Sequence, residues 1–227
     1  MGTLTYTELA AYTKVHLGDN AAWSSPTDYY AIWVNRAYQR LTTQDKFWGL
    51  RQSFYFPQLE TSSSADTVDG TAYVSVPSTA LVIRDVYDTE NYRLLNNITH
   101  HKYLGYLDRA DTTAEGAPVE WVRSASYIYL HPTPDDAYTL TIHYRKIPTA
   151  LSAGSDTTAI GPEWDEPIIT LAAHIGKMWT MDYEHAKLLK EEFLEQVAGI
   201  ITIYNSEARS RKEHIYLDET YRDRSYR

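Results

Sequence analysis

The sequence predicts an α+β protein: a four-helix bundle built from an N-terminal and a C-terminal helix pair, an inserted antiparallel β domain, and an extended C-terminal arm. Three observations predict it. Bulky apolar residues recur at helical spacing near both ends, the middle of the chain alternates with a period of two, and the last twenty residues are rich in charge. The expected boundaries are 1–49 and 160–206 for the bundle, 50–159 for the β domain, and 207–227 for the arm.

The N-terminal pair is expected at 3–18 and 27–48. The first helix ends at Gly18, a favoured C-terminal cap. Ser25 is a good N-cap for the second, and Pro26 suits its first helical position because the missing N–H costs nothing there. The residues expected to face inward are Tyr6, Leu9, Ala10, Thr13 and Leu17 in the first helix, and Tyr30, Trp33, Val34, Ala37 and Leu41 in the second.

The C-terminal pair is expected at 164–182 and 184–208, with Asp182 as the break between them. Prolines and carboxylates crowd the start of the first of these helices, where both are tolerated or favoured. Because a helix hairpin cannot bury its apolar stripe alone, we expect the two pairs to pack together. The inward residues are expected to be Ile168, Leu171, Ala172, Ile175, Trp179, Leu189, Phe193, Val197, Ile200, Ile201 and Tyr204.

The middle of the chain is expected to hold six strands and a short helix at about 99–108. Thr61–Asp66 and Asp111–Pro118 are predicted to be polar loops. Ser126 to Lys146 predicts a hairpin with a wide turn at Pro132–Asp136. The expected strands are Gln52–Phe56, Ala72–Val76, Leu81–Tyr87, Val119–Val122, Tyr127–Leu130 and Thr139–Tyr144.

Composition excludes several classes of protein. The 227 residues include no cysteine, so neither a disulfide framework nor a cysteine-ligated metal is possible. A net charge of −9 argues against general affinity for nucleic acid or an anionic membrane. No stretch suits a signal peptide or a spanning helix, which predicts synthesis in a cytoplasm. The chain has twenty tyrosines beside four phenylalanines, and tyrosine suits half-buried surfaces and interfaces.

The motifs predict no catalytic residue, no cofactor and no metal site. The glycines form neither a dinucleotide-binding pattern nor a P-loop. His100 and His101 are neighbours that point apart on a helix, and His174 is expected to be a packed residue. Asp135 and Asp136 lie in a turn, where aspartate is favoured for its backbone hydrogen bonds. The aromatic residues Trp121, Tyr127 and Tyr129 fit one packed face of a small sheet better than a stacking site.

The segment from Glu207 has too little apolar content for a core. It is either disordered or an arm that orders on a partner through charge pairs and tyrosine anchors. Arginine and tyrosine are enriched at interface hot spots, which favours the arm. The expected partner-binding residues are Arg209, Arg211, Tyr216, Tyr221, Arg222, Arg224, Tyr226 and Arg227.

Three segments combine into a recognisable set. They are YLHPTPDDAYTLTIHYRKIP at Tyr129–Pro148 with Leu151 after it, Ile160-Gly161-Pro162-Glu163-Trp164-Asp165-Glu166 at the opening of a long helix, and Tyr38-Gln39-Arg40-Leu41 on the second helix. With the order of helices, strands and charged tail, these segments resemble the head-to-tail adaptor (connector) proteins of tailed bacteriophages, of the portal-to-tail type. The resemblance extends in outline over the whole chain.

The resemblance implies a structural virion protein at the head-tail junction, without enzymatic activity. It implies a ring of twelve copies that joins the portal protein to the tail nozzle or first tail ring and lines the DNA channel. Genomic DNA would pass through without specific binding, which the negative charge favours. In relatives the C-terminal segment reaches the portal, which here corresponds to residues 207–227 by region.

Two other functions stay open at this point. The aromatic β region is compatible with a carbohydrate-binding or glycosidase-like module on a virion tail, with Asp135 or Asp136 in hydrolysis. The chain is also compatible with another ring of the phage neck or tail, such as a stopper or a terminator. That protein would differ in its partner and not in its chemistry.

Overall fold

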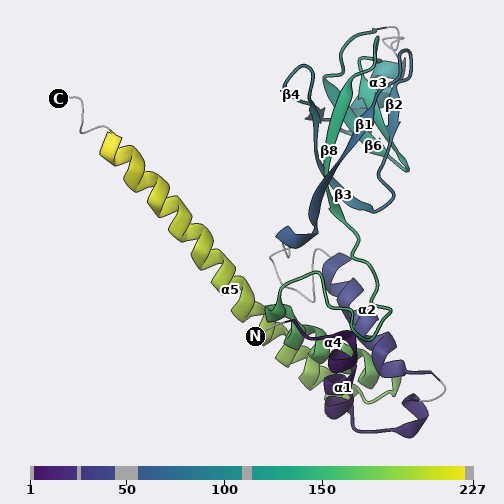
Figure 1. Cartoon of the computed structure of the whole chain (residues 1–227), viewed down its shortest axis with the longest axis vertical. Helices are drawn as coiled ribbons and strands as arrows, with labels where there is room; N and C mark the ends of the chain where they lie inside the picture. The colour runs from purple at the N-terminus through teal and green to yellow at the C-terminus, as the bar shows by residue number, and fades with distance from the viewer. Residues whose placement is uncertain (1–2, 25–26, 44–55, 109–113, 223–227) are drawn as a thin grey trace. The chain divides into compact units, whose positions relative to one another are not determined.

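The chain divides into two compact units in the computed structural model. A helical unit consists of Met1–Tyr55 and Thr149–Arg227, and a β unit consists of Phe56–Pro148 (Figure 1). The two ends of the sequence therefore share one unit, and the middle forms the other. The structure describes residues 3–24, 27–43, 56–108 and 114–222.

The first helix, α1 (Tyr6–Leu17), begins three residues later than predicted and ends at Gly18, as predicted. The Thr5 hydroxyl accepts a hydrogen bond from the Glu8 N–H, and the Glu8 carboxylate accepts one from the Thr5 N–H at 2.8 Å, a capping box. Gly18 ends the helix with a φ of 83°, a conformation that favours glycine. Leu9, Thr13 and Leu17 form its buried side.

The second helix, α2 (Tyr29–Thr43), follows a short 3₁₀ turn at Ala21–Trp23 and starts later than predicted. The Asp28 carboxylate accepts a hydrogen bond from the Ala31 N–H at 3.1 Å, so Asp28 caps this helix in place of the predicted Ser25. Ser25, Pro26 and residues 44–48 lie outside the described residues. All five predicted inward residues of α2 are buried.

The C-terminal helices are α4 (Asp165–Trp179), which follows a 3₁₀ turn at Pro162–Trp164, and α5 (Tyr183–Arg222). Asp182 separates them, as predicted. α1 and α2 contact each other and both contact α4, which also packs against α5. Since α4 is buried on most of its surface, the predicted helix pairs gather around this one helix.

Close packing at α4 depends on Gly176. A Cβ at this position would stand 2.7 Å from Leu17 Cδ1 and 3.0 Å from the Trp33 ring, closer than ordinary van der Waals contact. The absence of a side chain lets α4 approach α1 and α2 at this level. The Asn35 side chain also joins the unit, because it donates to the Leu151 carbonyl at 2.7 Å and accepts from the Leu151 N–H at 2.8 Å.

The length of α5 differs from the prediction. Its 40 residues span about 60 Å at the usual rise, against about 22 Å for the 15 residues of α4. The C-terminal part of α5 therefore continues past α4 (Figure 1). A separate arm was expected from Glu207, but the helix continues through this residue without a break to Arg222.

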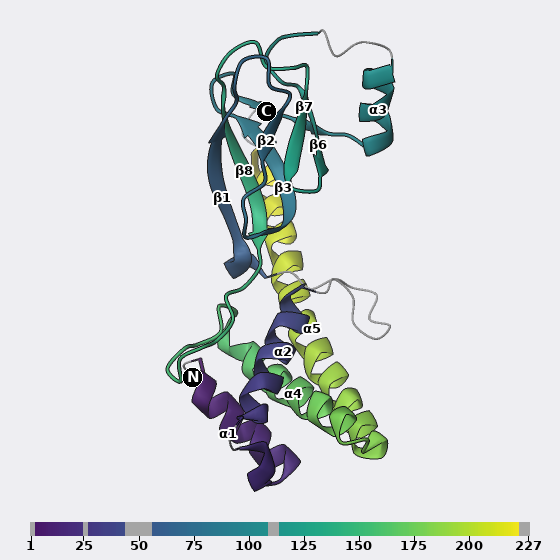
Figure 2. The ribbon, with the colours of Figure 1, turned by 90° about the vertical axis from the view of Figure 1, so that its right-hand side faces the viewer.

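The β unit is a sandwich. In the described residues the strands form two four-stranded sheets, ordered β1-β8-β3-β4 and β2-β7-β6-β5. All pairs are antiparallel except β5 with β6. A helix, α3 (His100–Asp108), lies beside β6 where a short helix was predicted (Figure 2). The strands are β1 (Glu60–Asp66), β2 (Tyr73–Ser75), β3 (Ala80–Asp88), β4 (Arg93–Leu94), β5 (Asn96–Asn97), β6 (Glu120–Ser124), β7 (Tyr127–His131) and β8 (Thr139–Lys146).

The core of the β unit lies between the two sheets. Val86 of β3, Ile128 of β7 and Ile142 of β8 are fully buried there, with Trp121 of β6 at 2% exposure. Alternate residues of each strand thus enter one shared core, which is the pattern that period-two alternation predicts.

Two predictions for the β unit are wrong. Thr61–Asp66 is strand β1 and not a loop, because main-chain pairing with β8 outweighs the turn preference of its serines. Ser126–Lys146 is not a hairpin, since β7 and β8 belong to different sheets. Pro132 and Pro134 have no N–H to donate to a ladder, and their segment carries the chain from one sheet to the other. The predicted strand Gln52–Phe56 lies outside the described residues except for Phe56, which is not in a strand.

Candidate assembly surfaces

The predicted partner-binding residues fall in two places. Arg209, Arg211, Tyr216, Tyr221 and Arg222 lie along the C-terminal half of α5. The other three, Arg224, Tyr226 and Arg227, lie outside the described residues. The structure therefore gives five of them a common helix, and their role in binding stays a prediction.

A second surface, missed by the sequence analysis, lies where α4 turns into α5. Four large apolar side chains are exposed here: Met178, Trp179, Met181 and Tyr183, at 45%, 54%, 74% and 58%. We call these four residues the hairpin patch. Neighbouring exposed apolar side chains are typical of surfaces that bind another protein. Trp179 was predicted to face inward, and its exposure corrects that expectation.

Trp179 is held from one side by α2. Its ring stacks on the Tyr29 ring at 5.3 Å between centroids, and the Trp33 ring lies at 6.0 Å. Trp33 in turn meets Trp23 edge to face at 5.6 Å. The exposed indole thus rests on a rigid aromatic cluster, so little side-chain entropy remains to be lost when a partner covers it.

The turn below the hairpin patch is fixed by polar contacts. The Asp182 carboxylate binds Lys177 Nζ at 3.1 Å and His185 Nδ1 at 2.8 Å. The hydrogen bond with His185, and to a lesser extent the one with Lys177, lowers the pKa of Asp182 to about 2. Met181 has a φ of 61°, a left-handed conformation that is strained for a residue with a side chain. The chain therefore holds an apolar side chain in solvent at a strained position, where glycine would be more stable.

A third surface covers the outer face of the second sheet. Tyr73 of β2 and Tyr127 of β7 meet edge to face at 4.8 Å and are 45% and 41% exposed. Tyr129 lies beside them and contacts Tyr103 of α3 at 5.3 Å. We call Tyr73, Tyr127 and Tyr129 the tyrosine face. As predicted, Tyr127 and Tyr129 share one face of a small sheet, here packed partly under α3, whereas Trp121 lies on the opposite face, in the core.

Helix α3 is attached to this sheet through Glu120. The Glu120 carboxylate accepts hydrogen bonds from Lys102 Nζ at 2.6 Å and from the Tyr106 hydroxyl at 2.7 Å. Burial opposes the charge of Glu120, but the two hydrogen bonds bring its pKa below the ordinary value. Tyr106 also stacks on His131 at 3.9 Å between ring centroids. The helix is therefore a fixed border of the tyrosine face.

The remaining candidates have structural roles. Trp121 is buried in the sandwich core and offers no ring for sugar stacking. The Tyr138 hydroxyl donates to Asp135 at 2.7 Å, which raises the pKa of Tyr138 to about 12. His174 is packed as predicted, with Nδ1 at 2.8 Å from the Ala186 carbonyl oxygen, and burial lowers its pKa.

Neither a metal centre nor a membrane span appears in the described part of the chain. No three His, Cys, Asp or Glu residues gather there in an arrangement that could hold a metal ion. Among the same residues, no helix combines the length and the apolar character needed to cross a bilayer.

Comparison with known protein families gives a match over most of the chain. The family described as SU10 adaptor protein matches residues 4–214, which include both units and most of α5. A comparison with curated proteins found no match.

Proposed function

The chain belongs to the SU10 adaptor protein family, a family of phage adaptor proteins, and we propose that it joins the portal to the tail in the virion. The observation that carries this proposal is the extent of the match, which begins before α1 and ends within α5. In this proposal twelve copies form a ring. One side of the ring binds the portal protein, and the other binds the tail nozzle or first tail ring.

The hairpin patch supports ring formation. A closed ring needs a heterologous contact, in which one surface of each copy binds a different surface of the next. Met178, Trp179 and Met181 offer a preorganised apolar contact of this kind. We propose that this patch packs against the helical unit of the neighbouring copy.

The C-terminal half of α5 supports the contact with the portal. A helix that continues past its packing partner cannot rely on that partner for stability there, and in proteins most of the stability of a helix comes from packing of its apolar face. We propose that residues 209–227 bind the portal and that this part of α5 binds as a helix. Its arginines and tyrosines would supply the charge pairs and aromatic anchors.

The charge of the chain is compatible with a channel for DNA. A net charge of −9 provides few cations to hold phosphates, so DNA would pass without strong binding. We propose that the ring lines such a channel. We assign the tyrosine face neither to the contact between ring copies nor to the contact with the portal.

Deletion of residues 209–227 tests the portal contact. We expect the shortened protein to fold with an unchanged helical unit, because α1, α2 and α4 pack together without this segment. We expect its binding to the portal protein to be lost in co-sedimentation, while a deletion of residues 223–227 alone weakens binding less. Full binding by the 209–227 deletion would contradict the proposed portal contact.

A further inference from the structure

One edge of the sandwich is unlike the other three. In the described residues of the β unit, the edge strands β2, β4 and β5 have only three, two and two residues. The fourth edge, β1, has seven residues and pairs with β8 alone in an unbroken register. Proteins usually protect a long edge with charges, proline or a bulge. The five central residues of β1, Thr61-Ser62-Ser63-Ser64-Ala65, contain neither charge nor proline.

The main-chain groups at this free edge can be assigned from the ladder. The Thr67 N–H donates to the Tyr138 carbonyl at 2.9 Å, next to the paired residues Asp66 and Thr139. In an antiparallel ladder this role repeats every second residue. The N–H and C=O groups of Ser62 and Ser64 therefore point away from β8, toward the free edge.

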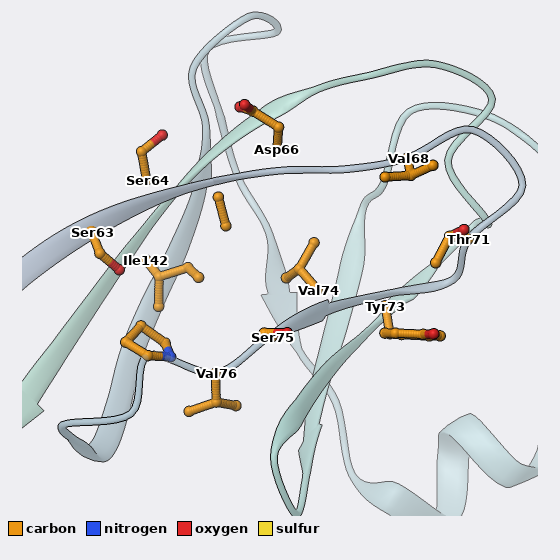
Figure 3. Close-up of a pocket in the computed structure, with 12 residues that line it drawn as sticks. Ser63, Ser64, Asp66, Val68, Thr71, Tyr73, Val74, Ser75, Val76 and Ile142 are labelled. Carbon is orange, nitrogen blue, oxygen red and sulfur yellow. The ribbon is translucent and has the colours of Figure 1, made fainter.

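A groove of about 700 Å³ opens beside β1, between it and β2. Figure 3 shows Ser63, Ile142 and Val74 directed into this space, whereas Ser64 and Asp66 point away from it. Sandwich strands usually place large apolar residues at inward positions, but β1 places Ser63 and Ala65 there. The core is thus short of side-chain volume along the same strand whose outer main-chain groups are unpaired.

The charges around the groove are negative. None of its lining residues is basic, and Asp66 lies at one end of β1. The loop that follows, which carries Asp69, is hydrogen-bonded to the segment of Asp135 and Asp136 through Thr67 and Gly70. At the other end of β1, Glu60 is paired with Arg84 at 3.4 Å. The Asp66 end therefore favours a cationic side chain.

We propose that β1 is a strand-addition site for another protein chain. The occupant is an extended segment with apolar side chains at alternate positions and a lysine or arginine at the Asp66 end. Its main chain pairs with Ser62 and Ser64, and its apolar side chains fill the groove over Val74 and Ile142. This mode combines main-chain hydrogen bonds for affinity with side-chain pockets for specificity. It goes beyond the proposed ring and portal contacts and does not depend on them.

A designed peptide tests the proposal on the full-length protein. The probe is fluorescein-labelled Lys-Thr-Val-Thr-Val-Thr-Lys, with lysine at both ends so that either strand direction can be used. We expect saturable binding by fluorescence anisotropy. A further peptide carries N-methyl groups on both edges, and we expect it to lose binding in either strand direction, because a strand pairs through the N–H and C=O groups of one edge. Equal binding by the methylated and the unmethylated peptide would overturn the proposal.

A substitution in β1 provides the second arm. Ser64→Pro removes one free-edge donor and no donor of the β8 ladder, so we expect peptide affinity to fall about fivefold, the effect of one hydrogen bond. Ser64→Ala keeps the N–H and is the matched control, with unchanged affinity. Far-UV circular dichroism verifies the fold of both variants. A folded Ser64→Pro protein that binds the peptide as tightly as wild type would also overturn the proposal.

Discussion

The helical unit and the β unit leave different chemistry at their surfaces. Around α4, packing is tight enough to require Gly176, and large apolar side chains emerge together at the hairpin patch. In the β unit, the core lies between two sheets, and the outer faces offer tyrosine hydroxyls and unpaired main chain. One chain thus carries two kinds of surface: an apolar one, which a partner would have to bury fully, and a polar one, which tolerates water.

Substitutions in the two cores should have the strongest influence on stability, each in its own unit. Leu171→Ala in α4 and Ile128→Ala in β7 each remove a fully buried side chain and should each cost about 2–5 kcal/mol of unfolding free energy. We expect each variant to lower the temperature of only one of two calorimetric transitions, because the two cores belong to separate units. Equal shifts of both transitions by either variant would show that the units unfold together.

A change at the hairpin patch should separate stability from assembly. Met181→Gly relieves a left-handed φ and should stabilise the helical unit by about 0.5–1 kcal/mol. The same change removes a 74% exposed side chain of the proposed ring contact, so we expect ring formation to weaken about tenfold in sedimentation.

The control for Met181→Gly is Val15→Ser, because Val15 is exposed on α1 and lies outside the hairpin patch. Glycine is not used at this position, since it would also disturb the helix. We expect Val15→Ser to leave ring formation unchanged. A Met181→Gly protein that assembles normally would remove this residue from the ring contact.

The smallest effect is a pH dependence confined to the helical unit. Burial, more than any other cause, lowers the pKa of His174. Its contribution to stability is therefore complete above about pH 6.5, the ordinary histidine value, and is lost as the pH falls from there through the folded-state pKa. Burial also raises the pKa of Asp165, whose contribution has the opposite sign and is lost as the pH rises through its folded-state pKa.

Thermal unfolding between pH 7.5 and 5 measures this dependence. We expect the helical transition of the wild type to fall by more than that of His174→Gln, a variant that cannot be protonated in this range. An identical pH profile for the two proteins would mean that the pKa of His174 is the same in the folded and the unfolded state.

The sequence predicted the elements whose signals are local. Helical spacing and end signals located α1 and the break at Asp182, and period-two alternation located β3, β6, β7 and β8. It failed where a distant partner decides. The serines of β1 form a strand only because β8 lies beside them. The assignment of β7 and β8 to different sheets is likewise a choice of partner that alternation does not encode.

The candidate surfaces were predictable only in part. The arginines and tyrosines after Glu207 are visible in the sequence, whereas the helix that carries five of them was not expected. The hairpin patch was missed because Trp179 continues the inward spacing of α4, although Met178 and Met181 beside the break at Asp182 were an available signal. The exposure of Trp179 depends on where α4 ends relative to α2, which periodicity cannot show.

The mass of the protein before and after mixing with the portal protein of the same phage tests the central proposal most directly. We predict that native mass spectrometry detects a portal complex that has gained twelve copies of this chain. A portal whose mass is unchanged after mixing, with the added protein correctly folded, would contradict the proposed role as a portal-to-tail adaptor.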